Sequence, residues 1–429
     1  MRLVADLHIH SKHSIATSGA MDLPQLAGWA ARKGIELLGT GDFTHGEWLE
    51  AIARELRPTG GGLLAASNGV LFALTSEVAL VWRYEGRCRR VHLLLLVPTL
   101  ADAARVRHAL TRFGSLDGNG RPMLGMDCIS FLDAIWNAAP DVEVIPAHIW
   151  TPWYSLLGSR SGFDGIDDCF GPHVDRIAAV ETGLSSDPPM NERVGRLDAM
   201  TLVSFSDAHS PSKIGREATV FELPEPGFAW IRNALRGERG ARVCETIEVH
   251  PEHGKYHYDG HRACGVAVSP DEARALGGIC PVCRKPLTLG VLHRVTDLAD
   301  RPAGLPRAKR VPHRTLLPLP ELVALVAKRR PQSRVVEREL NRLVERYGTE
   351  LRVLSEVPLE ELANDRLPGL ADAVRSVRTG RLHVRPGYDG VYGVASLQQE
   401  SDAVSPSGEN ASLTARSIRE RTEPSANAA

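Results

Sequence analysis

The chain has 429 residues, of which 43% are hydrophobic and 24% charged, and its 51 basic and 52 acidic side chains leave a formal net charge of −1. This composition is typical of a globular protein of two or three domains, and apolar runs such as residues 91–97 are too short to cross a bilayer. The N-terminus lacks the basic and apolar regions of a secretion signal, so we expect a cytoplasmic protein with no membrane partner.

Short β-rich runs alternate with helical patterns between residues 3 and 239. A helix is expected to begin after the N-cap Asp22 and to end at Gly34, because Pro24 suits an early helical position and glycine suits a helix end. The predicted strands cover residues 3–8, 35–42, 71–84, 90–97, 142–148, 176–182 and 201–207. Further helices are predicted at 100–113, 127–139 and 228–236. This alternation indicates a parallel barrel or an open α/β sheet.

The C-terminal half differs in composition. Residues 284–346 contain 15 Lys or Arg against 6 Asp or Glu, a local net charge of +9 that the neutral whole chain conceals. Helical patterns cover 319–327 and 333–347, and a Gly and Tyr turn region follows at 386–393. Residues 397–429 contain no aromatic side chains, so we expect this tail to be disordered. The expected divisions are a catalytic barrel (1–242), a zinc-binding ribbon (243–300), a mostly helical basic DNA-binding domain (301–396) and a disordered tail (397–429).

Polar, metal-competent residues stand at or near the ends of the predicted strands, where a barrel gathers them on one face. His8 and His10 form an HxH pair whose side chains point to the same side of a strand. Mixed imidazole and carboxylate donors suit Zn²⁺, Mn²⁺ or Fe, and a carboxylate such as Glu77 would bridge two ions about 3.5 to 4 Å apart, as in phosphoryl transfer. The candidate residues in this setting are His8, His10, Asp42, His45, Glu77, His92, His148, Glu181, Asp207 and His209.

These residues resemble the four motifs of the polymerase and histidinol phosphatase (PHP) superfamily: Asp6-Leu-His-Ile-His10, Gly41-Asp-Phe-Thr-His45, Glu77, His92, His148 and Ser206-Asp-Ala-His209. The resemblance implies an α/β fold with a distorted seven-stranded β/α barrel. It also implies two or three catalytic divalent ions (Zn, Mn or Mg), the first held by His8, His10, Glu77 and Asp207, the second by Glu77, His92 and His148. His45 and His209 would help to hold a third. Phe43 and Thr44 separate Asp42 from His45, so both remain candidates for that ion.

A cysteine cluster follows the predicted barrel. Cys280 and Cys283 have the CxxC spacing of a metal knuckle, and His261 with Cys264 supplies an HxxC partner, which together predict one structural zinc ion. A redox CxxC is the alternative, although it leaves the HxxC pair unexplained. His253 or His257 remains an alternative to His261 as the fourth ligand.

The order of barrel, zinc knuckle and basic segment resembles endonuclease Q over residues 2–394. The resemblance is carried by Pro146-Ala-His-Ile-Trp-Thr-Pro-Trp-Tyr154, Gly158-Ser-Arg-Ser-Gly-Phe-Asp164, Glu181-Thr-Gly-Leu-Ser-Ser-Asp187, Ser206-Asp-Ala-His-Ser-Pro211, Gly254-Lys-Tyr-His257, Cys280-Pro-Val-Cys283 and Gly387-Tyr-Asp-Gly390. It implies hydrolysis of the phosphodiester 5′ to uracil, hypoxanthine, xanthine or an abasic site in DNA.

Aromatic residues crowd the loop after His148, where an extruded base would need stacking partners. Core packing is the alternative reading of aromatics such as Phe163 and Phe170. Basic residues near the motifs are candidates for holding phosphates. The proposed DNA contacts are Lys12, Trp150, Trp153, Tyr154, Arg160, Ser161, Lys213 and Arg216.

The sequence therefore predicts a metal-dependent endodeoxyribonuclease for DNA repair, with Asp207, Glu77 and His8 in the catalytic roles. Its expected partners are DNA with deaminated bases or abasic sites and other repair or replication factors near the nucleoid. One alternative is a PHP-type phosphoesterase, either a phosphatase of small monoesters or an exonuclease. Another is a non-catalytic, zinc-dependent DNA-binding protein.

Overall fold

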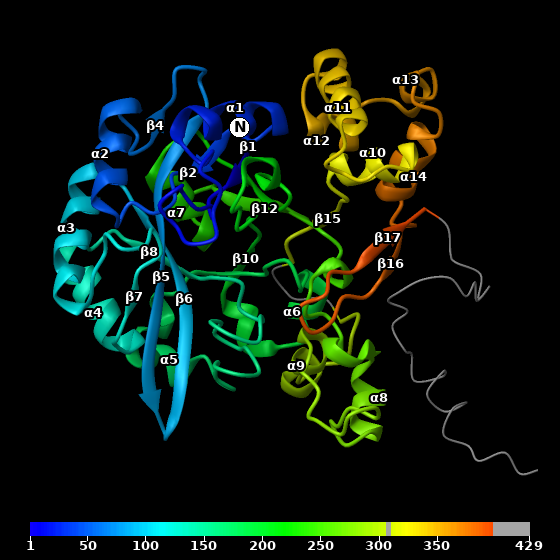
Figure 1. The fold of residues 1–429 in the computed structure, drawn as a ribbon. Coiled ribbons are helices and arrows are strands. Elements are labelled where there is room, and N and C mark those ends of the chain that lie inside the picture. Colours follow the sequence, from blue (N-terminus) through cyan, green and yellow to red (C-terminus); the bar gives the residue numbers. More distant parts are fainter. Residues whose placement is uncertain (306–309, 398–429) are drawn as a thin grey trace, which may run out of the picture.

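The computed structural model describes residues 1–305 and 310–397 (Figure 1). Except for Leu397, the tail that we expect to be disordered lies outside the described residues, as do residues 306–309 of the basic segment. Within the described ranges, no helix is long and apolar enough to span a membrane.

A central 11-stranded sheet organises the N-terminal part of the molecule. Its hydrogen-bonded order is β15 (His313–Thr315), β12 (Arg242–Glu248), β11 (Ala218–Glu222), β1 (Arg2–Asp6), β2 (Leu37–Gly39), β5 (Leu71–Tyr84), β4 (Leu64–Ala65) and β3 (Arg57–Pro58). Three further strands join it: β6 (Arg87–Val97) and β7 (Met123–Leu124) pair with β5, and β8 (Glu143–Pro146) pairs with β6. A separate parallel pair consists of β9 (Ala179–Glu181) and β10 (Thr201–Val203).

The sheet is mixed, whereas the sequence predicted either a parallel barrel or an open α/β sheet. Strands β1, β2 and β5 are parallel, whereas β11 runs antiparallel to β1 and β6 runs antiparallel to both β5 and β8. The reason is that β5 and β6 are joined by a short turn at residues 85–86, which permits only an antiparallel pair. The fold is thus a mixed α/β arrangement around a central sheet.

Helices cover this sheet, and the first shows why local signals place them correctly. In α1 (Leu23–Lys33) the Asp22 side chain accepts a hydrogen bond from the Gln25 amide, and Gly34 ends the helix in a left-handed conformation, which confirms the predicted limits. The other helices of this part are α2 (Gly46–Glu55), α3 (Leu100–Leu110), α4 (Cys128–Ala138), α5 (Asp167–Phe170), α6 (Pro188–Asn191) and α7 (Phe228–Arg236). Short 3-10 turns lie at Thr111–Phe113, Gly171–Arg176, Gly195–Ala199, Pro211–Lys213, Pro251–His253 and Arg262–Cys264.

Strands β5 and β6 form a long hairpin that reaches past helix α5 (Figure 1). Its register runs from the pair Leu74 and Val97 to the pair Tyr84 and Arg87. The prediction that Glu77 stands near the end of its strand is therefore wrong, because β5 continues for seven residues beyond it. A strand can extend this far past the sheet because β6 satisfies its backbone hydrogen bonds.

The C-terminal half contains a small cysteine-bearing region and a helical region. The first holds β13 (Asp259–His261), β14 (Val266–Val268), α8 (Pro270–Ala275) and α9 (Val291–Leu298). The second holds α10 (Leu319–Ala327), α11 (Arg334–Tyr347), α12 (Glu350–Ser355), α13 (Leu359–Ala363) and α14 (Leu370–Arg378), followed by the hairpin of β16 (His383–Arg385) and β17 (Val394–Ser396).

Polar contacts tie these regions together. The ammonium of Lys33 on α1 donates to Glu350 of α12 at 2.8 Å, and both side chains are buried. The turn between β16 and β17 lies against the start of the cysteine-bearing region, where the Gly387 amide donates to the Glu252 carbonyl and the Gly393 amide to the His253 carbonyl. The last hairpin therefore links the helical region to the cysteine-bearing region.

Candidate active site

Two groups of metal-competent side chains come together from β5, β6 and the segments that follow β1, β8 and β10. His8, His10 and Asp207 form the first group, and within it the donor atoms all lie within 4.8 Å of one another. The segments that carry them lie side by side, since Ile9 and Ala208 form an isolated parallel β-bridge. The second group has the same spacing and consists of Glu77, His92 and His148.

Glu77 is shared by the two groups. Its Oε1 atom lies 2.6 Å from Nδ1 of His92 and 3.2 Å from Nε2 of His148. Its Oε2 atom lies 3.2 Å from Nε2 of His10, in the first group. A carboxylate between two sets of donors is in the position of a ligand that bridges two ions.

Buried carboxylates orient the histidines of the first group. Nδ1 of His8 donates to Glu181 at 2.9 Å, and Nδ1 of His10 lies 3.2 Å from Oδ1 of Asp42. Asp42 is itself fixed, since its Oδ2 accepts hydrogen bonds from the Ser11 amide at 2.7 Å and the Ser11 hydroxyl at 2.6 Å. In both histidines the Nε2 atom is thereby left facing the group.

The backbone is unusual where it places three of these residues. Asp42, His148 and Asp207 have φ values of 49°, 31° and 46°, in the left-handed region that residues other than glycine seldom adopt. Beside His148, Gly183 also has a positive φ, and a Cβ atom there would lie 2.6 Å from the His148 Cβ. Such strained positions cluster at functional sites because the surrounding structure must hold them.

The electrostatics of the site fit a bound cation. Burial would lower the pKa of His8, but the carboxylates of Glu181 and Glu77 outweigh it and raise that pKa well above its ordinary value. Burial opposes the ionised form of Glu77, yet His92 and Arg121 hold its pKa well below the usual range. Nε2 of His8 is buried and has no hydrogen-bond partner among the described residues. An unpartnered imidazole nitrogen among carboxylates suits a divalent ion that takes nitrogen and oxygen ligands.

The side chains of the residues expected to hold a third ion have different neighbours. The His209 ring lies 4.4 Å from that of His10, and its Nδ1 contacts the Asp207 carbonyl at 2.9 Å. His45 lies beside His13 instead, with ring centroids 4.2 Å apart, and its Nε2 contacts the carbonyl of Asp117. Of the two candidates that the sequence left open, Asp42 is the one that contacts the first group.

Arg121 also contacts the site, although no motif in the sequence predicts it. Its guanidinium donates to Oε2 of Glu77 at 2.9 Å, and its side chain is 26% exposed, so it reaches the carboxylate from the solvent side. It stands in a glycine-rich loop before β7 with no pattern that marks it as functional. Only the fold brings it to Glu77.

A cavity of about 550 Å³ opens beside the metal groups. Trp153, Lys213 and Arg216, three of the expected DNA contacts, line it, together with residues that were not among the expected DNA contacts. Among these are Lys255, Tyr256 and Tyr392, from the cysteine-bearing region and the last hairpin. Trp153 and Tyr256 lie edge to face with their ring centroids 5.7 Å apart.

The other predicted DNA contacts divide by burial. Trp150 is only 1% exposed and donates from its indole to Asn191, and Phe163 and Phe170 are also buried, so packing explains most of these aromatics. Tyr154 is half-buried with its ring 4.7 Å from that of His92. The Ser161 hydroxyl is buried and accepts from the Tyr154 amide, whereas Lys12 and Arg160 are exposed.

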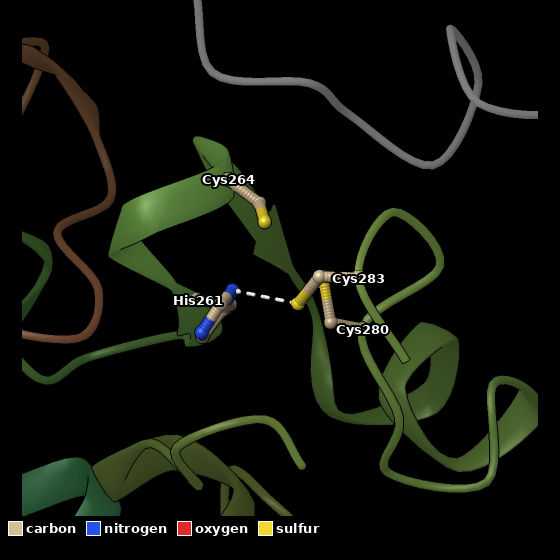
Figure 2. A group of neighbouring side chains, drawn as sticks. All are labelled: His261, Cys264, Cys280 and Cys283. Atoms are coloured by element: carbon tan, nitrogen blue, oxygen red, sulfur yellow. Dashed lines mark hydrogen bonds between the residues drawn. The ribbon is translucent and has the colours of Figure 1, made fainter. Parts of the chain in front are cut away.

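Figure 2 shows a third donor group, in the cysteine-bearing region. His261 and Cys264 come from β13 and the turn after it, and Cys280 and Cys283 come from the loop that faces them. All four donor atoms lie within 4.8 Å of one another, and Nδ1 of His261 is 3.4 Å from Sγ of Cys283. Tetrahedral zinc separates such nitrogen and sulfur ligands by about 3.5 Å, so the arrangement fits zinc.

Known proteins are similar in sequence to most of this chain. The MJ0043 C-terminal domain family matches residues 318–381. The uncharacterized protein YqxK of Bacillus subtilis is 30% identical over 417 residues, which cover 91% of this chain and 98% of YqxK. The uncharacterized protein MJ0043 of Methanocaldococcus jannaschii is 30% identical over 258 residues, 58% of this chain and 32% of that protein.

Solved structures are also similar to this chain over most of its length. The lesion-specific endonuclease PfuEndoQ from Pyrococcus furiosus is 32% identical, with a TM-score of 0.83 over 93% of this chain and 96% of its own. Endonuclease Q in complex with a 27-mer duplex that carries an abasic lesion at the active site is also 32% identical, with a TM-score of 0.84 over 93% of this chain and 98% of its own. The chain therefore belongs to the endonuclease Q family.

Proposed function

We propose that this chain is a metal-dependent DNA repair endonuclease that hydrolyses the phosphodiester 5′ to uracil, hypoxanthine, xanthine or an abasic site. The observation that carries the proposal is Glu77, which lies between two histidine-containing donor groups, and each group has a member, His148 or Asp207, that lines the cavity. The solved relative bound to a duplex with an abasic lesion supports the choice of substrate.

In this proposal His8, His10, Asp207 and Glu77 hold one divalent ion, and Glu77, His92 and His148 hold a second. Asp42 or His45, together with His209, would hold a third. Zn, Mn and Mg are the candidate metals. When bound, such ions supply positive charge that lowers the pKa of water and offsets negative charge on the phosphate.

The protein's own groups prepare the site for that chemistry. Glu181 keeps the proton of His8 on Nδ1, and Asp42 does the same for His10, so that both Nε2 atoms remain free to bind. Arg121 places a guanidinium beside Glu77 on the solvent side, where a phosphate oxygen would approach. Lys213 and Arg216 line the cavity and would position the backbone on either side of the cut.

We propose that Trp153 stacks on the extruded nucleotide, because it is the exposed aromatic of its loop and lines the cavity. The four donors around Cys283 hold a structural zinc within a ribbon that covers residues 243–300. We propose that the catalytic unit at 1–242 is a distorted seven-stranded β/α barrel, to which the central sheet adds β12 and β15 from beyond that limit. Residues 301–396 form a basic helical domain that binds DNA. Other repair or replication factors would meet the protein near the nucleoid.

The test uses full-length protein stripped of metal and then reconstituted with Mn²⁺, Mg²⁺ or Zn²⁺. Duplexes that carry one uracil, hypoxanthine, xanthine or abasic site are incubated with it, and the nick is mapped on a sequencing gel. We expect a single nick on the 5′ side of the lesion that disappears on chelation. Release of phosphate from small monoesters, or exonucleolytic shortening, would favour the phosphoesterase alternative.

Matched variants separate chemistry from folding. Asp207→Asn and His8→Ala should abolish the nick while duplex binding survives, because phosphates are held by other residues. Asp175→Asn and His108→Ala change exposed residues away from both donor groups and should nick like the unmodified protein. Duplex binding without any nick in reconstituted protein would favour the non-catalytic alternative.

A further inference from the structure

The outer part of the β5–β6 hairpin, residues 81–90, is a basic arm. It carries Arg83, Arg87, Arg89 and Arg90 against a single acidic residue, Glu85. Most ion pairs of the structure involve arginine, yet none of these four lies within 4.0 Å of a carboxylate of the described residues. Figure 1 shows the arm extending beyond the body of the central sheet.

The register of the hairpin sorts these arginines onto two faces. His92 stands opposite Ala79, Arg90 opposite Val81, and Arg83 opposite Cys88. Because side chains alternate along a strand, Arg90 and Arg83 share the face that carries Glu77 and His92. Arg87 and Arg89 belong to the opposite face.

The two faces have different environments. On the opposite face Arg89 donates to the Gly162 carbonyl and lies 4.4 Å from the centroid of the Phe163 ring, so it packs the arm against the loop. On the metal-site face the Tyr154 ring lies 4.7 Å from that of His92 and 5.4 Å from the Arg90 guanidinium. A continuous row thus leads from a candidate metal ligand to Arg90 and on to Arg83.

The length of this row of side chains matches the spacing of successive phosphates along a DNA strand. A strand rises about 3.4 Å per residue, so Arg90 stands about 7 Å beyond His92 and the level of Arg83 about 14 Å beyond it. Successive phosphates of one DNA strand advance about 3.4 Å along the helix axis, so the row corresponds to about four nucleotides. Guanidinium groups match phosphate oxygens in charge and in geometry.

We propose that the metal-site face of the arm holds the phosphate backbone of duplex DNA beside the cut, through Arg90 and Arg83. This inference rests on the proposed function and adds a contact surface outside the cavity. Lesion chemistry plays no part in it, since the arm meets only sugar and phosphate.

The test compares two exposed arginines of the same arm. Arg83→Gln and Arg87→Gln remove the same charge four residues apart, but only Arg83 is on the metal-site face. Affinity for a duplex with one abasic site is measured at several salt concentrations under chelation. We expect Arg83→Gln, and separately Arg90→Gln, to lower the slope of log affinity against log salt by about 0.9, the value for one phosphate contact. Arg87→Gln should keep the slope of the unmodified protein.

Cys88 gives a second measurement that does not depend on affinity. It is exposed, pairs with Arg83 and shares its face. A saturating concentration of duplex should therefore slow the alkylation of Cys88 by a maleimide. The alkylation rate is followed by mass spectrometry, and the rate at Cys244 serves as the internal reference. An unchanged rate at Cys88 in the bound complex would overturn the proposal.

The outcomes also separate this inference from the proposed function. If Arg83→Gln and Arg87→Gln have equal salt slopes in a protein that nicks the abasic duplex, only the proposal about the arm is overturned. A protein that binds the duplex but never nicks it would overturn the proposed function. The salt slopes would then still test whether the arm contacts phosphates. Absence of duplex binding would overturn both.

Discussion

Nδ1 of His8 donates to the carboxylate of Glu181 at 2.9 Å, and both side chains are fully buried. In the neutral form that binds a metal ion an imidazole carries one N–H, so in that form this contact places the proton of His8 on Nδ1 and leaves Nε2 as an acceptor. Nε2 has no partner among the described residues and faces Glu77 and Asp207. In the proposed site Glu181 would therefore hold His8 in the orientation that leaves Nε2 available to a divalent ion.

Glu181→Gln should weaken metal binding by 10- to 100-fold, as is usual when the partner of a ligating histidine is lost. The amide keeps the size of the carboxylate but removes its negative charge, so the effect reports the electrostatic part of the contact. Metal affinity is measured by titrating stripped protein with Zn²⁺ or Mn²⁺ in a competition assay. Glu85→Gln, at the exposed hairpin tip, is the control. Equal affinity in both variants would show that Glu181 does not act on the metal site.

Cys280→Ser should release about one equivalent of tightly bound zinc and lower the melting temperature. The thiolate is one of four donors, and the site joins segments with few apolar contacts of their own. Zinc content is measured by elemental analysis after dialysis, and melting by calorimetry. Cys88→Ser removes an exposed thiol outside the group and should change neither. Retention of all zinc in Cys280→Ser would contradict the assignment.

The sequence predicted many elements well because their signals are local. The limits of β5, α7 and α10 match the predicted ranges. Helix α11 begins one residue after the predicted start at Ser333, whose side chain caps it by accepting from the Val336 amide. Hydrophobic period and capping residues act within a few positions along the chain, so one sequence reveals them.

The parts that could not be predicted depend on contacts between distant segments. Glu77 lies seven residues before the end of the strand predicted over 71–84, and only the fold brings it to His10 and His148. Arg121 reaches Glu77 from 44 positions away, and Tyr392 reaches the cavity from the last hairpin. The sequence also cannot separate Trp150 from Trp153, since burial depends on which side of the loop faces Asn191.

A pair of buried carboxylates makes stability depend on pH. Burial raises the pKa of Glu248 to about 8, and burial beside Glu248 raises the pKa of Glu217 well above its ordinary value of 4.5. Below pH 4.5 the folded and unfolded chains are both protonated at Glu248. Between pH 4.5 and about 8 only the folded chain keeps the proton, so the free energy of unfolding falls as pH rises, by up to about 1.4 kcal/mol per pH unit for each group.

Glu248→Gln should remove its share of this dependence. Urea unfolding of both proteins at pH 6 and pH 8 gives the comparison, and we expect the unmodified protein to lose about 1 to 3 kcal/mol more than the variant over that interval. Taking the difference between the two proteins cancels the pH dependence of groups that do not interact with Glu248, and it includes the part of the Glu217 shift that Glu248 causes. Parallel stability curves would mean that Glu248 is already ionised at pH 6.

The two tryptophans of the loop after His148 should respond differently to truncation. Trp153 is 39% exposed, lines the cavity and meets Tyr256, whereas Trp150 is 1% exposed and donates to Asn191. Stacking of an aromatic side chain on a base contributes about 1 to 3 kcal/mol, so Trp153→Ala should slow cleavage of a uracil-containing duplex by about 5- to 150-fold. Removing a buried tryptophan costs about 3 to 5 kcal/mol of folding free energy, so Trp150→Ala should mainly lower the melting temperature.

Both variants are measured for melting temperature, for cleavage of the uracil duplex and for affinity to the same duplex without the lesion. Trp153→Ala should keep its melting temperature and most of its affinity for undamaged DNA, because phosphate contacts do not depend on the base. If Trp153→Ala weakens binding to damaged and undamaged duplex by the same factor and leaves the ratio of their cleavage rates unchanged, Trp153 does not hold the extruded base. Tyr256 and Tyr392, on the other side of the cavity, would then be the aromatics to test next.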